Sequence, residues 1–354
     1  MKTNALTLLV FLFCGFSAFS QARMIRTGEV PGYVTLKCDF HTHTIFSDGE
    51  VWPTFRIREA VEDGLDAIAI TDHLEYHPKQ SYVKGDDNSA FAIARKSAEL
   101  NNLLLVRGTE VTRRMPPGHL NLLFLPDSIV FEDTTFLKVI EKAVSQGAFV
   151  QWNHPGWIAQ QPDGVARMLE IHRELIRKGW LHGIEIYNDE NFYPGVMEWC
   201  ADNNLAIIGN TDVHGTTYEV MQDQRTDHRV MTLVFAKDKS IPSLKEALFA
   251  GRTLVWYGDT LAGEKEWAEP FVRSSLKVTV NPAKDKKSID YRIDNPTDIP
   301  FHLTDGGNPD APKRIDLPAR SYRIIRLKKE GDQKLVYTVS NVKTGTGELL
   351  KIQW

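Results

Sequence analysis

Residues 34–43 read VTLKCDFHTH, a short apolar and β-branched run that leads directly into two histidines. Alternate residues of a strand point to the same side, so His41 and His43 can reach one metal ion together. His-x-His alone is a weak signal, because a chain of 354 residues with 11 histidines often contains it by chance. Its position at the end of a predicted strand, with Asp48 shortly after it, makes it a candidate metal site.

Five further clusters of polar residues have similar positions. They are TDH at 71–73, RGTEVT at 107–112, GHLN at 118–121, QWNHPG at 151–156 and GNTDVHG at 209–215. All of them except GHLN, which opens a strand, follow an apolar run, so we expect them at the carboxyl edge of one sheet. Enzymes with α/β barrels build their active sites at that edge. A single histidine at a strand end is usually structural, but six such clusters together favour a functional centre.

The clusters contain nine candidate ligands with nitrogen or oxygen donors. These are His41, His43, Asp48, His73, Glu110, His119, His154, Asp212 and His214. Nine ligands are too many for one ion, and they suit two or three divalent ions of the Zn, Mn or Fe type without a thiolate site.

Short apolar runs alternate with helical patterns from residue 33 to residue 257. The runs lie at 34–38, 67–70, 103–106, 120–125, 148–150, 183–186, 205–208 and 231–235, and the helical patterns at 53–63, 88–102, 134–146, 164–178, 193–203 and 241–250. Strands joined through helices usually run parallel. The pattern therefore predicts an α/β fold whose parallel sheet closes into a barrel.

The pattern changes near residue 262. Residues 268–354 contain alternating runs such as LKVTV at 276–280 and YRIIRL at 322–327, separated by turn residues and without a helical pattern. This predicts a small antiparallel β-sandwich with its own core. We therefore expect a metal-binding domain over residues 23–262 and a β-sandwich domain over residues 268–354.

The first 22 residues resemble a secretory signal peptide. Lys2 precedes an apolar run at 6–19, and small residues follow, so cleavage is expected after Ser20 or Ala22. No later stretch reaches 18 apolar residues, so we expect an exported protein, periplasmic or secreted, with no transmembrane segment after signal removal. Cleavage would remove Cys14 and leave Cys38 and Cys200, which we expect as buried thiols, although a disulfide between them stays open.

The composition is that of an ordinary globular protein, with 42% hydrophobic and 25% charged residues and a net charge of −4. This charge gives no support to a specific nucleic-acid site or to binding at a membrane surface. The chain also lacks a glycine-rich phosphate loop, a Gly-x-Ser-x-Gly motif and a credible Cys–His pair, so triphosphate use and covalent catalysis are unsupported.

At this point the motifs resemble a known family. DFHTH at 39–43, SDG at 47–49, TDH at 71–73, GTE at 108–110, GH at 118–119, NHP at 153–155 and TDVHG at 211–215 are similar to the motifs of the PHP (polymerase and histidinol phosphatase) superfamily, in the same order. The resemblance covers about residues 35–257. More narrowly, the export signal and the C-terminal β domain resemble exported bacterial phosphodiesterases of the Sb-PDE type.

The resemblance implies a distorted (β/α)7 barrel with a trinuclear metal site. It assigns His41, His43, Glu110 and Asp212 to one ion, with Glu110 bridging to a second ion that His119 and His154 hold, and Asp48, His73 and His214 to the third ion. Asp48 stands where some members of the family carry histidine.

Other candidates have weaker support. Asp72 is a candidate catalytic residue that could accept a hydrogen bond from a ligand imidazole or contact a metal. Its structural alternative is to cap the turn that follows it. Arg225 and Arg252 are the basic residues that we select to face phosphate, from a set that also contains Lys79, Lys84, Arg113 and Arg114. Pocket-lining roles are expected for Asn153, Trp157, Tyr187 and Asn188, and a role behind the ligands for Glu185.

The predicted function is metal-dependent hydrolysis of a phosphate ester by a metal-activated hydroxide, with a small phosphodiester as the predicted substrate. Three alternatives stay open: a phosphomonoesterase of the histidinol-phosphatase type, hydrolysis at carbon of the amidohydrolase type, and a non-catalytic binding module that retains metals. The sequence does not predict an oligomeric state.

Overall fold

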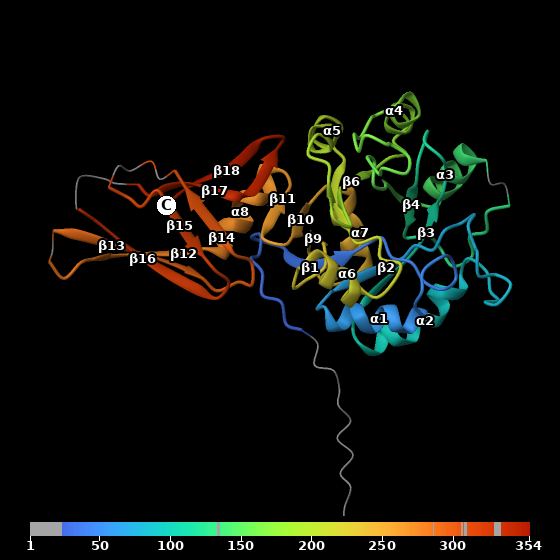
Figure 1. Cartoon of the computed structure of the whole chain (residues 1–354), viewed down its shortest axis with the longest axis horizontal. Coiled ribbons are helices and arrows are strands. Elements are labelled where there is room, and N and C mark those ends of the chain that lie inside the picture. The colour runs from blue at the N-terminus through green and yellow to red at the C-terminus, as the bar shows by residue number, and fades with distance from the viewer. Residues whose placement is uncertain (1–22, 133–134, 286, 306, 308–309, 329–333) are drawn as a thin grey trace, which may run out of the picture.

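The computed structural model describes residues 23–354 apart from 133–134, 286, 306, 308–309 and 329–333. The described chain forms an α/β barrel and a smaller β domain that lie side by side, with helix α8 (Lys265–Ser275) between them (Figure 1). The predicted signal peptide lies outside the described residues. Within the described part, no helix combines the length and the apolar character that crossing a membrane requires.

The barrel is a curved sheet with helices on its outside (Figure 1). Its strands are β1 (Val34–Asp39), β2 (Ala67–Ile70), β3 (Leu104–Val111), β4 (Leu120–Leu123), β5 (Phe149–Trp152), β6 (Gly183–Asn188), β8 (Ala206–Asn210) and β9 (Met231–Ala236). Its helices are α1 (Pro53–Glu62), α2 (Ser89–Leu100), α3 (Phe136–Ser145), α4 (Glu170–Arg177), α5 (Val196–Asn203), α6 (Thr217–Gln224) and α7 (Ile241–Phe249). Most strands are buried along their whole length, which explains their continuous apolar character. The predicted α/β barrel is confirmed.

The barrel sheet is mixed rather than all parallel. β1, β2 and β3 run parallel, as do β5, β6 and β8, but β4 is antiparallel to both of its neighbours and β9 is antiparallel to β1. The segment between β3 and β4 contains no helix, and a parallel return needs a dozen residues or more. In the described chain, β8 and β9 lie next to each other without a strand ladder between them, and one side chain connects them: the Thr232 hydroxyl accepts from Gly209 N–H and donates to the Gly209 carbonyl.

The seven barrel helices of the described chain agree with the sequence prediction except at two places. α4 begins at Glu170, later than predicted, and α6 was not predicted. A signal for α6 is present in the sequence, because Thr216 and Glu219 form a capping box at its start.

The C-terminal part is an antiparallel β-sandwich, as predicted. One sheet contains β12 (Lys277–Pro282), β13 (Ser288–Asn295) and β16 (Ser321–Lys328), and the other contains β14 (Phe301–Thr304), β15 (Arg314–Leu317), β17 (Val336–Gly345) and β18 (Glu348–Gln353). The prediction that residues 268–354 contain no helix is wrong, because α8 continues to Ser275. Ala268, Phe271, Val272 and Ser275 are buried along one face of it, at the spacing of an amphipathic helix.

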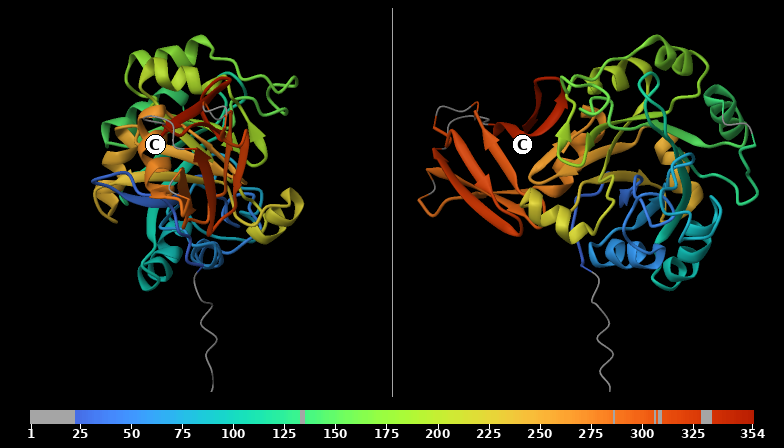
Figure 2. Two further views of the ribbon diagram at one scale, coloured as in Figure 1. Left: turned by 90° about the vertical axis from the view of Figure 1, so that its left-hand side faces the viewer. Right: turned by 45° about the vertical axis from the view of Figure 1, so that its right-hand side comes forward.

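The two parts share one sheet and one core, contrary to the prediction of separate cores. β10 (Thr253–Tyr257) pairs with β9 and with β11 (Thr260–Ala262), and β11 pairs in parallel with β17 of the β-sandwich. A single buried cluster runs from barrel residues such as Phe235 through Phe271 of α8 to Val339. Figure 2 shows β17 and β18, in red, reaching from the sandwich to the barrel. The boundary near residue 262 is therefore a change of architecture within one packed unit.

The cysteines agree with the preferred prediction. Cys38 and Cys200 are both buried and neither forms a disulfide. Cys14 lies outside the described residues.

Candidate metal centre

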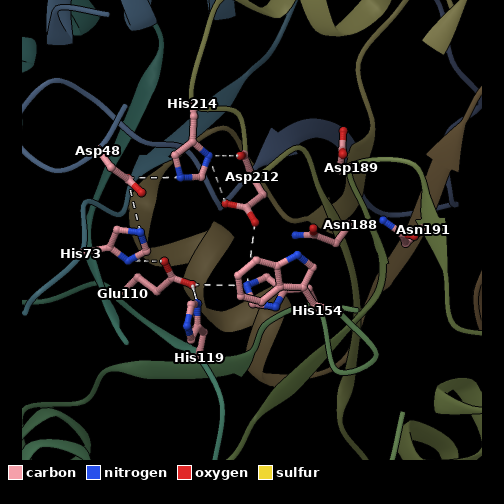
Figure 3. Close-up of a pocket in the computed structure, with 11 residues that line it drawn as sticks. Asp48, His73, Glu110, His119, His154, Asn188, Asp189, Asn191, Asp212 and His214 are labelled. Atoms are coloured by element: carbon pink, nitrogen blue, oxygen red, sulfur yellow. Dashed lines mark hydrogen bonds and ion pairs between the residues drawn. The ribbon is translucent and has the colours of Figure 1, made fainter. Parts of the chain in front are cut away.

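The nine predicted ligands meet at one end of the barrel. His41 and His43 follow β1, His73 follows β2, His154 follows β5, and Asp212 and His214 follow β8, whereas Glu110 lies in β3 and His119 precedes β4. Seven of the nine line one cavity of about 300 Å³: Asp48, His73, Glu110, His119, His154, Asp212 and His214 (Figure 3). His41 and His43 lie behind them and are fully buried.

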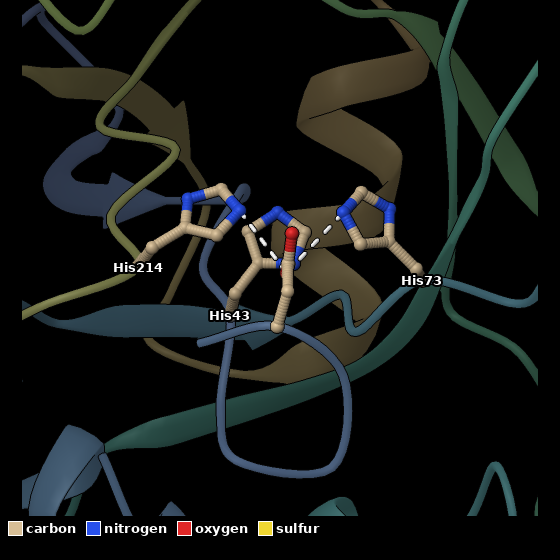
Figure 4. A group of neighbouring side chains, drawn as sticks. His43, His73 and His214 are labelled. Atoms are coloured by element: carbon tan, nitrogen blue, oxygen red, sulfur yellow. Dashed lines mark ion pairs between the residues drawn. The ribbon is translucent and has the colours of Figure 1, made fainter. Parts of the chain in front are cut away.

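One group of ligands surrounds the Asp48 carboxylate. Its Oδ1 atom lies 3.3 Å from His73 Nε2, 3.2 Å from His214 Nε2 and 3.9 Å from His43 Nδ1 (Figure 4). The resemblance assigned Asp48, His73 and His214 to one ion, and the structure adds His43 to this group. The rings of His43 and His214 stack with their centroids 4.2 Å apart.

Glu110 occupies the middle of the centre. Its Oε1 atom lies 3.3 Å from His41 Nε2, 3.1 Å from His119 Nδ1 and 3.6 Å from His154 Nε2, and its Oε2 atom lies 3.5 Å from His43 Nε2 and 2.7 Å from His73 Nδ1. A carboxylate with histidines around both oxygens is placed to bridge two ions. Asp212 also lies close to two of these histidines, with its Oδ1 atom 3.0 Å from both His41 Nε2 and His43 Nε2.

The arrangement fits metal ions better than a hydrogen-bonded network. Two of these buried atoms, His41 Nε2 and Glu110 Oε2, form no hydrogen bond with any described residue, although other ligand atoms lie close to both. Tetrahedral ligands at about 2.1 Å from a zinc ion lie about 3.4 Å from one another, which is the spacing seen here. Three groups of ligand atoms lie within 4.8 Å of one another, namely His43 with Asp48, His73 and His214, His41 with His43 and Asp212, and His41 with Glu110 and His154.

Burial and neighbouring charges shift the pKa values of several of these ligands. Although burial favours their neutral forms, the surrounding histidines hold the pKa values of Asp48, Glu110 and Asp212 below the ordinary range. Burial lowers the pKa of His43 to about 4, so its imidazole is neutral and able to bind a metal. Burial also acts on His73, but Glu110 and Asp48 outweigh it and raise its pKa to about 10. Metal binding must therefore displace protons from part of the centre.

Glu185 orients the ligands from behind, as predicted. It is fully buried, His41 Nδ1 lies 2.9 Å from its Oε1, and the backbone N–H of His154 donates to its Oε2 at 2.7 Å. A hydrogen bond at Nδ1 leaves His41 Nε2 as the atom that faces the centre. Asn153 has a similar role, because its amide donates to Glu110 Oε1 at 2.8 Å.

Two ligands have strained backbones. His154 has φ = 27° and Asp212 has φ = 55°, both in the left-handed region that non-glycine residues rarely adopt. Such conformations cost free energy and persist where surrounding contacts impose them, which is common at functional sites.

Asp72 supports the centre without facing the cavity. Its Oδ1 accepts from Thr44 N–H at 2.7 Å and from the Ser47 hydroxyl at 2.6 Å, and its Oδ2 accepts from the Thr44 hydroxyl. The predicted catalytic role is corrected, and the alternative of capping the following turn does not describe Asp72 either, because both of its oxygens hold the Thr44–Ser47 loop that leads to Asp48. Lys79 holds the same loop by donating to the Asp48 and Gly49 carbonyls.

The two selected arginines do not line the cavity. Arg252 is buried, donates to the Phe235 carbonyl and forms an ion pair with Glu246. Arg225 ends α6 in a left-handed conformation. The sequence places both near strand or helix ends, but it does not encode the direction of such long side chains, so the prediction that they face phosphate is wrong.

The side of the cavity away from Asp48 and His73 comes from a tight hairpin (Figure 3). Asn188, Asp189 and Asn191 lie at the turn between β6 and β7 (Asn191–Phe192) and line the cavity together with Trp157. Trp157 and Asn188 were predicted, whereas Asp189 and Asn191 were missed. Tyr187 was predicted to line the cavity, but it does not, and its ring packs at a tilt against Tyr257 with the centroids 4.0 Å apart. Burial, followed by repulsion from Asp212 and Glu190, raises the pKa of Asp189 to about 6.

The comparisons with known proteins agree with this site. Residues 39–190 match the PHP domain and residues 276–354 match an Ig-like domain. A structure from Bacteroides vulgatus, described as a two-domain protein containing a predicted PHP-like metal-dependent phosphoesterase, is 36% identical, with a TM-score of 0.88 over 94% of this chain and 98% of that chain. An uncharacterized protein of Methanocaldococcus jannaschii is 26% identical over 191 residues, which are 51% of this chain and 82% of that protein.

The fold and the site therefore define an α/β barrel with a cluster of candidate metal ligands at its mouth. The chain belongs to the PHP family, in the two-domain form with a C-terminal Ig-like domain. Its relatives support a metal-dependent hydrolase with the fold of a phosphoesterase.

Proposed function

We propose that this protein hydrolyses small phosphodiesters with two to three divalent ions of the Zn, Mn or Fe type, held in a trinuclear arrangement by the nine clustered ligands. The cavity wall is the observation that supports the diester. Among the described residues that line it there are four carboxylates and neither lysine nor arginine.

The absence of these cations from the lining matters because the two ester classes differ in charge. A monoester dianion needs its non-bridging oxygens neutralised, and arginine forks usually contribute to this. A diester carries a single negative charge, which the ions can offset without cationic side chains. The histidinol-phosphatase type of monoesterase is therefore the weaker alternative.

The residues of the chain position the metal ligands for this reaction and shape the cavity around them. Bound divalent ions lower the pKa of water and offset charge on phosphate. Glu185 and Asn153 hold His41 and Glu110 in place, and Asp72 holds the loop of Asp48. Trp157 lies beside His154, with the ring centroids 5.2 Å apart, and limits solvent on that side.

The test compares two esters with one leaving group. Protein of defined metal content is expected to show a higher kcat/KM for ethyl 4-nitrophenyl phosphate than for 4-nitrophenyl phosphate. His41→Ala and Asp212→Ala should be nearly inactive on both, whereas Glu348→Ala in the Ig-like domain should retain activity. A clear advantage for the monoester would overturn the diester proposal and leave the metal centre standing.

We further propose that the protein acts outside the cytoplasm, in the periplasm or as a secreted protein. The support is the signal-like pattern of residues 1–22. Protein purified from the producing cell should begin at Gln21 or Arg23 when its N-terminal sequence is determined. A protein that retains Met1 and fractionates with the cytoplasm would contradict export.

A further inference from the structure

The hairpin between β6 and β7 presents a row of polar side chains beside the metal centre. Asn188 and Asn191 are directly paired across the two strands, and Asp189 and Glu190 form the two-residue turn. Asn188, Asp189 and Asn191 line the cavity, whereas the exposed Glu190 does not. Two amides and a carboxylate therefore line the cavity from one short segment (Figure 3).

Part of the hydrogen-bonding capacity of these side chains is unused within the described chain. Gln224 of α6 donates to Asp189 Oδ1 at 2.5 Å, and Asp189 Oδ2 accepts from no described residue. Asn188 donates to Glu185 Oε2 at 2.8 Å, which leaves its amide oxygen as an acceptor. The side-chain amide of Asn191 has no hydrogen-bond partner among the described residues and offers both a donor and acceptors.

The aromatic side chain of Trp157 lines the same cavity as these polar groups. Trp157 is 39% exposed, and the centroid of its ring lies 5.6 Å from that of the His119 ring and 5.2 Å from that of the His154 ring. A flat aromatic face at the mouth of a polar cavity can cover the C–H surface of a small alcohol. The cavity volume of about 300 Å³ limits the alcohol to a small one.

We propose that the hairpin tip of Asn188, Asp189 and Asn191, with Trp157, binds the alcohol part of the ester, and that this alcohol is a small polyol such as a glycerol or sugar unit. Amide and carboxylate groups in a row match neighbouring hydroxyl groups, which both donate and accept. This inference rests on the proposed function, because it places one substituent of the phosphate ester in the same cavity.

A cationic alcohol such as choline fits these surroundings less well. The carboxylate of Asp189 would attract an ammonium group, but divalent ions in the adjacent centre would repel it over the short distances of this cavity. Neutral hydroxyl groups avoid that repulsion. They also use the free amide of Asn191, whose donor an ammonium group cannot accept.

The experiment uses three diesters that share the 4-nitrophenyl leaving group and differ in the other alcohol: 2,3-dihydroxypropyl, propyl and choline. We expect metal-loaded protein to prefer the dihydroxypropyl ester over the propyl ester by about tenfold or more in kcat/KM, because unpaired polar groups in a site penalise an analogue without hydroxyls. Asp189→Ala and Asn191→Ala should each lower this ratio toward one. Glu190→Ala, in the same turn but outside the cavity, should keep it.

The outcomes separate this inference from the proposed function. Equal cleavage of the dihydroxypropyl and propyl esters, or a preference for the choline ester, overturns the polyol site while the phosphodiesterase stands. If no diester is cleaved, the proposed function fails, and the site is tested by calorimetric titration of metal-loaded protein with glycerol 3-phosphate and propyl phosphate. Tighter binding of glycerol 3-phosphate that Asp189→Ala abolishes would support the polyol site, and equal binding would refute it.

Discussion

The barrel and the Ig-like domain differ in whether they bury charged residues. Both have ion pairs on their surfaces, such as Arg167–Asp163 on the barrel, but no described charged residue of the Ig-like domain is buried, whereas several in the barrel are. In the barrel, Arg229 is 1% exposed and contacts two carboxylates, and the metal centre brings three further carboxylates among six histidines. In the Ig-like domain, charges form surface ion pairs, namely Arg292–Asp294, Arg314–Asp316, Arg320–Asp298 and Arg326–Asp290. Buried charge is costly and needs compensation, so the barrel interior is arranged around chemistry and the sandwich interior around packing.

The largest expected effect comes from removing the Ig-like domain. A chain that ends at Ser275 loses the strand that pairs with β11 and exposes Phe271 and other residues of the shared core. We expect it to be unfolded or insoluble beside the full-length chain, as measured by circular dichroism and gel filtration. A soluble, cooperatively unfolding fragment that binds metal would show instead that the two parts have independent cores.

The second-largest effect is expected at Glu110, the carboxylate in the middle of the metal centre. Glu110 touches histidines with both oxygens, so Glu110→Ala should lose more than one ion and lower kcat by about a thousandfold or more. Elemental analysis and the diester assay measure these losses. Glu348→Ala, on the sandwich, should keep both metal and activity. At most one ion in metal-supplemented wild-type protein would rule out the trinuclear proposal.

Two arginines, one buried in the barrel and one exposed on the Ig-like domain, test whether buried charge pairs matter more for the free energy of unfolding than exposed pairs do. Arg229 contacts Asp39 at 3.0 Å and Asp63 at 2.8 Å inside the barrel. Arg229→Met leaves these carboxylates without their partner, so we expect a loss of about 3–5 kcal/mol in the free energy of unfolding. Arg326→Met, which removes an exposed pair with Asp290, should change the denaturation midpoint little. Similar losses in both variants would contradict the difference between the two regions.

A smaller effect should appear when pH is lowered. His172 is buried, its ring stacks on Trp152 at 3.7 Å, and its Nε2 donates to the Pro117 carbonyl. Burial lowers the pKa of His172 to about 4, against about 6.5 in an unfolded chain. As the pH falls, the unfolded chain therefore takes up a proton on His172 at a higher pH than the folded chain does. His172 does not lower the free energy of unfolding above about pH 6.5, but it lowers this free energy by at most about 3 kcal/mol as the pH falls toward 4.

Urea denaturation at pH 7 and at pH 4.5 measures this loss. His172→Gln, which cannot take up a proton, should show a smaller difference between the two pH values than the wild type does. An equal difference in both proteins would exclude His172 as the source.

The metal centre could be predicted because its signals are local. Eight of the nine ligands lie within four residues of a strand end, Asp48 lies in the loop after the first strand, and parallel strand ends meet at one edge of a sheet. The features that could not be predicted depend on contacts with other parts of the fold or on the direction of a side chain. Asp72 and Arg252 were misassigned because their partners, the Thr44–Ser47 loop and Glu246, are set by the fold. Asp189 and Asn191 were missed because the strand after their turn, β7, has only two residues.

The shared sheet was missed for a similar reason. The pairing of β11 with β17 joins segments that are far apart in the chain, and neither strand carries a sign of its partner. The helix α8 is different, because its buried face has a helical spacing that the sequence already contains.

The pairing of β11 with β17 also sets an order of events during synthesis. About 70 residues separate Ala262 from Val336, so the ribosome adds residues for several seconds, at about 5–20 per second, before the partner of β11 exists. Over that interval the last strand of the barrel sheet is an open edge, and open edges can pair with other chains. A chain that stops before β17 would therefore leave this edge without its partner, because Val342 and Lys343 of β17 are the residues that pair with β11.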